Sequence, residues 1–386
     1  MLVFPVAGIS ARQHFDRSSS TGLVGPQRVS WKNLHIINMP DQSTNIAVTD
    51  GFTNLHPGDE DDFNATLSSE LGDDFLLYRK QWDVAATFET VPEYPLHIDF
   101  ELNHSCNLKC PMCPYGIPEL DEKNIGKRSW FSFNTFKKIV DGGVGRGLRS
   151  IGVNWLNEPL IRPDIADFVA YARARGIVDV FIHTNAMLLT KDMSERLIDA
   201  GLTRLVVSID AITDKTYEKV RVGGDLQKVK DNVFKFLGLR EKNDSQLPLL
   251  STAFCKMSEN MEELQQFEDF WRPHVNYLTI QNYIEMENRS GEGDSPFDKN
   301  KHPEFQCTHP FRRAVIRHDG TFLPCCNTAH APYLPMGNIH ETGIQEIWMS
   351  DGMRKLRELH RNGEYYKNPV CRACVKGCQG LTEDAS

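Results

Sequence analysis

From Leu96 onward, short apolar runs rich in β-branched residues alternate with longer stretches whose apolar positions recur every three or four residues. The first pattern is typical of buried strands and the second of amphipathic helices. Their regular alternation predicts βα units around a parallel sheet. The predicted strands are Leu96–Leu102, Ser150–Trp155, Val178–His183, Arg204–Ile209, Leu249–Cys255 and Tyr277–Tyr283. The predicted helices between them are Phe133–Val140, Ile165–Arg175, Lys191–Ala200, Val229–Leu239 and Met261–Trp271.

The segments on either side of this region lack the alternation. Residues 1–90 contain acidic and Ser/Asn/Gly-rich stretches, which predict a partly disordered N-terminal extension. Gly291–Pro303 is polar and rich in Gly, Asp and Lys, as expected of a linker. We therefore expect an α/β domain over residues 91–290 and a Cys-rich C-terminal domain over residues 304–380.

Composition narrows the class of protein. The chain has 386 residues, of which 40% are hydrophobic, and its net charge is −9. The hydrophobic content suits a globular core, and the acidic balance argues against a nucleic-acid surface. No apolar run approaches the roughly 18 residues that a membrane span needs. Because no secretory signal accompanies the ten cysteines, we expect metal ligation in a reducing, cytoplasmic setting rather than disulfides.

Three cysteines follow the first predicted strand in a C-x3-C-x2-C run, namely Cys106, Cys110 and Cys113. Four-iron clusters are normally held by four cysteines. A set of three leaves one iron without a protein ligand, so that a small molecule can bind it. The spacing alone also permits a zinc loop.

Polar residues follow the next three strands. Ligands gather at the C-terminal ends of strands in parallel α/β folds, which directs attention to Glu158, Asn185, Ser208 and Asp210. Arg221 lies thirteen residues beyond Ser208. Its guanidinium either clamps a carboxylate or is solvated on a helix.

A second group of cysteines lies near the C-terminus. Two of them frame a C-x12-G-x4-C pattern around Gly320, and two form a later C-x2-C pair. Four thiolates complete either a closed iron–sulfur cluster or a structural zinc site, and the spacing alone leaves both open. The four are Cys307, Cys325, Cys371 and Cys374. The two that remain are Cys326 and Cys378.

The Cys triplet, the Leu-Asn-Glu-Pro and Thr-Asn-Ala turns and the C-terminal cysteine pattern resemble motifs of the radical S-adenosylmethionine (SAM) superfamily, SPASM/twitch subgroup. The resemblance covers roughly residues 90–380. It implies an α/β fold, a partial (βα)6 barrel, followed by a C-terminal Cys-rich auxiliary-cluster domain of the twitch or SPASM type. It also implies SAM, a SAM-binding 4Fe-4S cluster on the triplet and one auxiliary 4Fe-4S cluster on the C-terminal four. Leu, Asn and Ala stand here where the family motifs have glycines.

The resemblance also assigns the residues that bind SAM. Glu158 would accept the SAM ammonium, and Arg221 would pair with its carboxylate. Met112 would pack on the adenine, although any core Met could occupy such a position. The full set of implied SAM-binding residues is Met112, Glu158, Asn185, Ser208, Asp210 and Arg221.

The implied activity is reductive cleavage of SAM to a 5′-deoxyadenosyl radical, which abstracts hydrogen from a small-molecule or peptide substrate. A reductant such as flavodoxin or ferredoxin would supply the electron. We expect an oxidoreductase that oxidises a sugar- or cyclitol-like molecule through the auxiliary cluster, similar to 2-deoxy-scyllo-inosamine dehydrogenases. The alternatives are epimerisation with Cys255 as catalytic hydrogen donor, maturation of a ribosomal peptide, and a non-enzymatic metal scaffold. Cys255 can also be a small buried core residue.

Overall fold

Six apolar segments form six neighbouring parallel strands, which lie side by side in sequence order. Their bounds are β2 His97–Phe100, β3 Ser150–Gly152, β4 Asp179–Thr184, β5 Arg204–Ser208, β6 Leu249–Lys256 and β7 Tyr277–Asn282. All six predicted strands are confirmed. The largest differences are at β2 and β3, each three residues shorter than predicted; beyond β3, the backbone N–H of Trp155 donates to Asn157 Oδ1 at 3.0 Å instead of to a neighbouring strand.

The computed structural model describes residues 54–55, 59–116, 129–243, 246–283, 305–325 and 334–379. All of them belong to one unit of the chain, residues 46–386. The expected linker at Gly291–Pro303 and the first 53 residues of the expected N-terminal extension lie outside the described residues.

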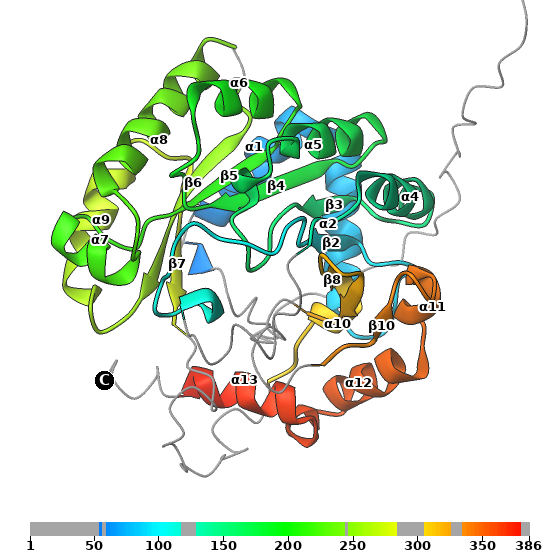
Figure 1. The fold of residues 1–386 in the computed structure, drawn as a ribbon. Helices are drawn as coiled ribbons and strands as arrows, with labels where there is room; N and C mark the ends of the chain where they lie inside the picture. Colours follow the sequence, from blue (N-terminus) through cyan, green and yellow to red (C-terminus); the bar gives the residue numbers. More distant parts are fainter. Residues whose placement is uncertain are drawn as a thin grey trace, which may run out of the picture. The chain divides into compact units, whose positions relative to one another are not determined.

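Helices between the strands cover one face of the sheet. Figure 1 shows α4, α5 and α6 along this face. Several begin with a Ser, Thr or Asp whose side chain accepts a backbone N–H of the first turn, which satisfies a donor that the helix leaves unpaired. The seven-residue α7 was not predicted, because it is too short to show a clear period. The bounds are α4 Phe133–Val144, α5 Ile165–Ala174, α6 Lys191–Asp199, α7 Asp214–Val220, α8 Leu226–Glu241 and α9 Leu264–Trp271. Single 3₁₀ turns are η1 Pro114–Gly116, η2 Pro159–Ile161 and η3 Met261–Glu263.

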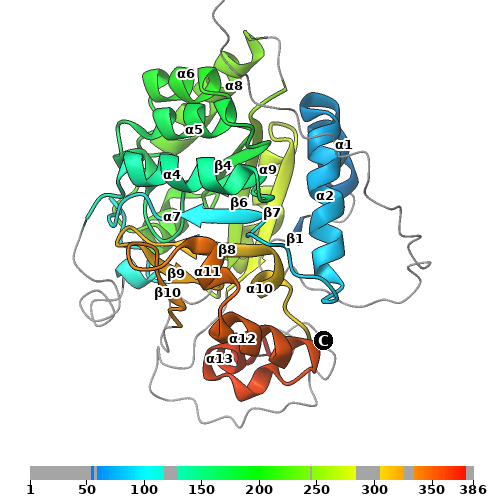
Figure 2. The same ribbon diagram turned by 90° about the vertical axis from the view of Figure 1, so that its right-hand side faces the viewer.

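Two helices that precede β2 in sequence lie on the other side of the sheet, as Figure 2 shows. Their apolar residues Phe75, Tyr78 and Trp82 form a buried cluster with Leu249 and Tyr277, the first residues of β6 and β7. The helices therefore pack where the strands begin and leave the C-terminal strand ends for a ligand. Their bounds are α1 Asp59–Leu71 and α2 Asp73–Ala86.

The Cys-rich C-terminal segment extends the same sheet. Its first strand, β8, pairs in parallel with β2, and β9 and β10 follow as antiparallel neighbours. With β1 on the edge of β7, the described residues form one ten-stranded sheet. The expected α/β barrel followed by a Cys-rich domain is confirmed. The bounds are β1 Asn54–Leu55, α10 His309–Arg312, β8 Arg313–Ile316, β9 Thr321–Leu323, β10 Gly337–Asn338, α11 Ile344–Trp348, α12 Asp351–Arg361, η5 Tyr365–Lys367 and α13 Pro369–Gln379.

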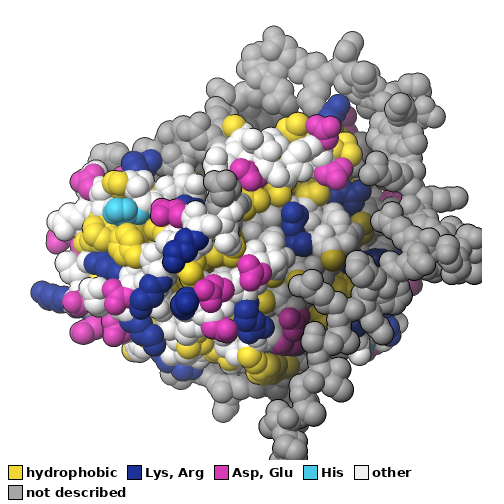
Figure 3. All heavy atoms as spheres, turned by 90° about the horizontal axis from the view of Figure 1, so that it is seen from above, with side chains coloured by type: hydrophobic (Ala, Val, Ile, Leu, Met, Phe, Trp, Pro, Cys, Tyr) yellow, Lys and Arg dark blue, Asp and Glu magenta, His cyan; other side chains and the backbone are white. Residues whose placement is uncertain are grey.

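The surface carries charges of both signs. On the face seen in Figure 3, Lys and Arg side chains lie among Asp and Glu side chains over the described part of the chain. This mixture lacks the single-sign field with which a nucleic-acid surface attracts phosphates. Among the described helices, none combines the length and the apolar character that a bilayer crossing requires.

Candidate functional site

The loop that carries Cys106, Cys110 and Cys113 follows β2 and is fastened to neighbouring loops. The Lys109 N–H donates to Val222 O at 2.9 Å, and the Glu158 N–H donates to Ser105 O at 2.9 Å. The loop then folds tightly back on itself, because a Cβ on Gly116 would lie only 2.0 Å from Cys110 O. The three sulfurs are therefore placed by backbone contacts that leave no room for a side chain at position 116.

Nitrogen donors surround two of these sulfurs. Cys106 Sγ accepts from Leu108 N at 3.4 Å and from Asn185 Nδ2 at 4.0 Å. Cys110 Sγ accepts from Arg221 Nη1 at 3.8 Å. Burial raises the pKa of the Cys106 thiol to about 12, but a bound cationic metal centre favours the thiolate, which these donors then stabilise.

Glu158 lies in the loop after β3, directly before η2, and is almost fully buried, at 2% exposure. Its Oε1 accepts from Thr184 Oγ1 at 2.6 Å and from Leu160 N at 3.0 Å, while Oε2 accepts from Asn185 N at 2.8 Å. The sequence did not single out Thr184 as a partner. Because a carboxylate offers about four acceptor positions, Glu158 both fixes the β4 turn and keeps capacity for one further donor.

The backbone conformation shows how the chain accommodates Leu, Asn and Ala at positions where the radical SAM motifs have glycines. Neither Leu156 nor Asn157 has a positive φ, so this turn accommodates side chains. Ala186 does have a positive φ of 57°, and Asp210 at the end of β5 has one of 63°. Left-handed conformations of non-glycine residues cost about 1–3 kcal/mol and concentrate at functional sites. Here they mark the ends of two adjacent strands.

Asp210 connects β6 to the cluster loop. Its Oδ1 accepts the backbone N–H of Cys255 at 2.7 Å, and its Oδ2 forms an ion pair with Arg221 Nη2. Because Arg221 also donates to Cys110 Sγ, one chain of contacts runs from Cys255 to the cluster loop. The Arg221 side chain is only 14% exposed, which is not the environment of a solvated helix residue.

The other predicted SAM-site residues surround this network. Asn185 Nδ2 also donates to Asn107 Oδ1 at 2.9 Å, which ties the β4 turn to the cluster loop. Ser208 is the half-buried last residue of β5. Met112 is half-buried and packs against the main core. The structure thus brings the Cys triplet and all six polar or apolar SAM-site candidates to the same end of the sheet.

The four C-terminal cysteines line one small cavity. They come from three separate segments: Cys307 precedes α10, Cys325 follows β9, and Cys371 and Cys374 lie on α13. Apart from His309 and His360, the rest of the lining is apolar. Cys326 and the side chain of Cys378 lie outside the described residues.

The separation of the thiols bears on the zinc alternative. Zn–S bonds of about 2.3 Å in a tetrahedral site bring sulfurs to about 3.8 Å from one another. Among the described residues, the groups of three potential ligands whose atoms all lie within 4.8 Å of one another include no set of three cysteines. No three of these described thiols are as close together as a single zinc ion would bring them.

The glycine between Cys307 and Cys325 has a clear physical role. Gly320 has a positive φ of 84°, and a Cβ there would lie 2.5 Å from His340 Cδ2. Only glycine combines this φ with so close an approach. The C-x12-G-x4-C pattern therefore encodes the β8–β9 turn that returns the chain to Cys325.

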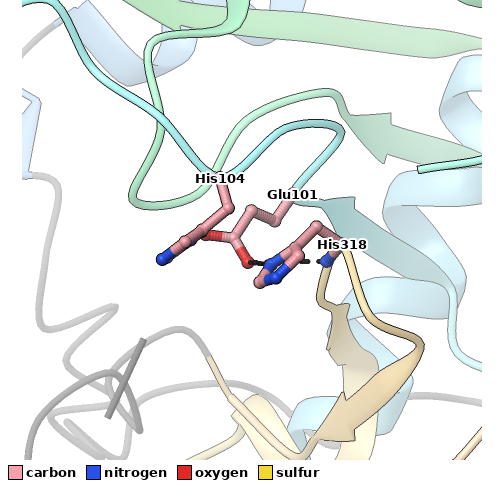
Figure 4. A group of neighbouring side chains, drawn as sticks. All are labelled: Glu101, His104 and His318. Atoms are coloured by element: carbon pink, nitrogen blue, oxygen red, sulfur yellow. Dashed lines mark hydrogen bonds and ion pairs between the residues drawn. The ribbon is translucent and has the colours of Figure 1, made fainter. Parts of the chain in front are cut away.

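A buried polar group that the sequence analysis missed joins the two domains. Figure 4 shows Glu101 and His104, which follow β2, facing His318 from the β8–β9 turn. Glu101 accepts from His104 Nδ1 at 2.9 Å, His318 Nδ1 at 2.8 Å and Arg317 Nε at 3.2 Å. Burial alone would raise the pKa of Glu101, but the two histidine hydrogen bonds and the Arg317 charge lower it to about 2.

This group, Glu101, His104, Arg317 and His318, is called the interdomain cluster below. Its two histidines and one carboxylate lie close enough together to hold a metal ion. The Arg317 guanidinium occupies the remaining side of the carboxylate, and its positive charge opposes a cation at that point. Because Glu101 already receives these donors, the group is explained as a hydrogen-bonded ion pair.

Family models match two parts of the chain. The model of the radical SAM superfamily matches residues 100–248, and the model of the SPASM iron–sulfur cluster-binding domain matches residues 307–375. Together they include the cluster loop, the strand ends and the four C-terminal cysteines.

Individual relatives are more distant. A probable GTP 3′,8-cyclase from Methanococcus maripaludis is 30% identical over 182 residues, which cover 47% of this chain. The matched region spans 57% of that relative's length. The structure of anSMEcpe with bound AdoMet has a TM-score of 0.52 at 13% identity, covering 72% of this chain and 84% of that one. Streptococcus suis SuiB bound to its precursor peptide SuiA has a TM-score of 0.50 at 16% identity, covering 77% and 80%. At these identities the two structures show a shared fold alone.

The matched domains imply SAM, a SAM-binding 4Fe-4S cluster and auxiliary iron–sulfur ligation. The site fits such a cofactor. Arg221 Nε is buried and has no hydrogen-bond partner among the described residues, and Glu158 keeps one acceptor position. An orphaned cationic donor and a spare carboxylate position suit a ligand that carries a carboxylate and an ammonium, as SAM does. The chain carries a radical SAM domain over residues 100–248 and a C-terminal SPASM domain over residues 307–375.

Proposed function

We propose that Cys106, Cys110 and Cys113 hold the SAM-binding 4Fe-4S cluster. They lie on one loop at the C-terminal ends of the strands, and hydrogen bonds from three neighbouring segments reach their sulfurs or the loop backbone. The second set, which lines the C-terminal cavity, would hold the auxiliary 4Fe-4S cluster. These ligands are Cys307, Cys325, Cys371 and Cys374.

The proposed SAM site uses the groups with unused hydrogen-bonding capacity. Glu158 accepts the ammonium with its remaining lone pair, and Arg221 Nε meets the carboxylate. Both carboxylate oxygens of Asp210 already have protein partners, one of which is Arg221. Asp210 therefore orients Arg221. Asn185 and Ser208 line the adjacent strand ends, and Met112 packs on the adenine.

When bound, the first cluster and SAM supply a 5′-deoxyadenosyl radical that takes a hydrogen atom from the substrate. The protein holds the substrate near that radical and excludes water. A flavodoxin- or ferredoxin-like reductant would deliver the electron that starts the reaction.

The substrate proposal rests on a cavity of about 360 Å³ inside the barrel. That volume lies in the range of small-molecule sites. The cavity reaches the C-terminal strand ends at Asn154, His183 and Gln281, and α2 closes it with Tyr78 and Trp82. We infer that a substrate held in this cavity would face the proposed SAM site across these strand ends.

Two of the three arginines that line this cavity are paired with acids. Arg204 is paired with Asp179, and Arg313 is paired with Asp99. Burial lowers the pKa of His183 to about 4, so this ring is neutral near pH 7. Paired charges and neutral donors predominate in this lining, and we infer that they favour a neutral substrate with several hydroxyl groups over an apolar molecule.

We therefore infer oxidation of a sugar- or cyclitol-like alcohol to a carbonyl. The carbon loses a hydrogen atom to the radical, the hydroxyl group loses a proton to solvent, and one electron leaves the substrate. The auxiliary cluster, when bound, supplies an acceptor for that electron. The substrate then leaves with two hydrogens fewer.

Epimerisation is the second candidate, because of where Cys255 lies. Alternation along β6 places Cys255 on the opposite face from Phe254, which packs against Phe267 beneath the outer helices. The Cys255 side chain is thus directed to the barrel interior, close to Asp210. A thiol there can return a hydrogen atom to a substrate radical.

Two other substrates have weaker support. SuiB binds the precursor peptide SuiA, but the likeness in fold does not transfer a peptide substrate, and the cavity suits a small molecule. The cyclase relatives match less than half of this chain, so GTP is a substrate to test rather than to assume.

Anaerobic turnover with a panel of neutral cyclitols and amino sugars in heavy water tests the proposal. Oxidation gives a product about two mass units lighter with no deuterium at carbon, and Cys255→Ala retains this turnover. Epimerisation gives one deuterium at carbon, which Cys255→Ala abolishes while deoxyadenosine still forms.

The panel also includes GTP and peptides. Deoxyadenosine formation that depends on one of these, with no response to any polyol, would contradict the proposed substrate class. Gln281→Leu, which removes a polar group of the cavity wall, should weaken a polyol substrate without changing SAM affinity.

A further inference from the structure

His360 lies beside the four C-terminal cysteines and belongs to none of the motifs. It is near the end of α12 and is 1% exposed. Its ring contacts two of the proposed cluster ligands: the Cys307 N–H lies 3.2 Å from Nδ1, and Cys371 Sγ lies 3.4 Å from Nε2.

These two contacts fix the position of the ring proton. A backbone N–H can only donate, so Nδ1 must accept from Cys307 and carries no proton. In the neutral ring the proton then resides on Nε2, which faces the sulfur. His360 is therefore oriented as a hydrogen-bond donor to Cys371 Sγ.

The ring is held in this orientation by its surroundings. Tyr365 is nearly parallel to it, with an interplanar angle of 14°, and Phe305 packs on the edge of Tyr365. Leu356 and Val370 complete an apolar wall around the cysteines. In such a low-dielectric environment a single hydrogen bond to sulfur has a larger electrostatic effect than it has in water.

We propose that His360 donates a hydrogen bond to the Cys371 thiolate and thereby raises the reduction potential of the auxiliary cluster. Reduction adds negative charge that is shared with the thiolates, and an N–H donor stabilises that charge. The donor makes the auxiliary site a better electron acceptor whatever the substrate is. His360 is thus a positioning residue that acts through Cys371. This role rests on the proposed auxiliary cluster and not on the proposed substrate oxidation.

The test measures the reduction potential in full-length protein by an EPR-monitored redox titration. A Cys106→Ala, Cys110→Ala, Cys113→Ala background leaves only the auxiliary signal. In this background, His360→Phe and His360→Leu remove the donor, while His360→Gln retains an N–H. Val370→Ala is the matched control, since it alters the same wall without touching the hydrogen bond.

We expect a lower potential in His360→Phe and His360→Leu with iron content unchanged. His360→Gln should recover part of the difference, and Val370→Ala should match the parent. An unchanged potential in a variant with full iron content overturns the proposal. Loss of the auxiliary iron in both Phe and Leu variants also overturns it, because His360 would then build the site. The same titration on the otherwise native chain is an independent check, and neither readout depends on any substrate.

Discussion

The two proposed iron–sulfur cluster sites differ in where their cysteines come from and in the polarity of the residues around them. The first takes all three thiols from one short loop, and its neighbours are polar side chains at the ends of β3, β4 and β5. The second draws its thiols from a segment before α10, the end of β9 and helix α13, and its walls are mostly apolar.

The difference reflects what each site must exchange. At the first, Glu158 and Arg221 keep unused hydrogen-bonding capacity, which a ligand that arrives and leaves can occupy. At the second, four thiols would ligate every iron of the proposed cluster, so that electrons can enter or leave while no iron is open to a ligand. An open site needs directed polar groups, whereas an electron-transfer site needs enclosure and a tuned environment.

The largest expected effect comes from removing each thiol set in turn. Cys106→Ala, Cys110→Ala and Cys113→Ala together should abolish deoxyadenosine formation and leave about half the iron of the wild type. Cys371→Ala with Cys374→Ala should also lose about half the iron but retain SAM cleavage. Iron and sulfide analysis with a deoxyadenosine assay checks both. Cleavage that survives in the triple variant would reverse the two assignments.

Gly116→Ala should damage only the first site. Its Cβ would lie 2.0 Å from Cys110 O, so the loop must shift, and overpacking of this kind costs about 1–3 kcal/mol. We expect loss of SAM cleavage with the auxiliary iron retained. Gly238→Ala in α8 is the control, since nothing lies within 4 Å of its added Cβ. Normal SAM cleavage by Gly116→Ala would show that the loop is not held as described.

Glu101→Gln tests the interdomain cluster that joins the two regions. The variant leaves Arg317 buried beside a neutral group, a change that typically costs about 3–5 kcal/mol. Denaturant unfolding of the protein without iron–sulfur clusters, near pH 7, measures the loss in the free energy of unfolding. Asp351→Asn, which breaks an exposed ion pair with Arg354, serves as the control and should change little.

The same carboxylate predicts a dependence on pH. The pKa of Glu101 falls from 4.5 to about 2 on folding. A depressed carboxyl pKa stabilises the fold above the unfolded value, and this contribution disappears as the pH falls from about 4.5 to about 2. The gap in stability between wild type and Glu101→Gln should narrow over that interval. A constant gap would mean that Glu101 is not ionised in the folded protein.

The smallest expected effect is on SAM affinity. Glu158→Gln loses a charge-assisted hydrogen bond to the ammonium, about 1.5–3 kcal/mol, which weakens SAM roughly tenfold or more. Because Glu158 also accepts Asn185 N and Thr184 Oγ1, Thr184→Val isolates the effect on the turn. Isothermal titration under anaerobic conditions measures both. Equal losses in the two variants would assign Glu158 to the turn alone.

The sequence predicted those parts of the fold that show local patterns. Strands and most helices followed from apolar periodicity, and the cysteine spacings directed attention to both sites. The pairing of β8 with β2 could not be predicted, because four residues carry no signal of their neighbour. The interdomain cluster was missed for a similar reason, since Glu101 and His318 are far apart in sequence and meet only through that pairing.

Among the site residues too, those in local motifs could be predicted and those defined by tertiary contacts could not. Glu158 was recognisable from its Glu-Pro turn, but its hydrogen bonds with Thr184 and Asn185 depend on the distance between β3 and β4. His360 lies eleven residues before Cys371 on a different helix, and an isolated histidine has no periodic or motif context. Residues that hold a ligand recur in motifs, whereas residues that orient those ligands are recognised only from contacts.

The parallel pairing of β8 with β2 has a consequence for how this architecture can be divided. With β3 on one side and β8 on the other, β2 has no free edge. A truncated chain that ended after β7 would expose the backbone donors and acceptors of β2, which form a template for self-association. The C-terminal domain is therefore not a detachable module, because the barrel depends on it to cover one edge of β2.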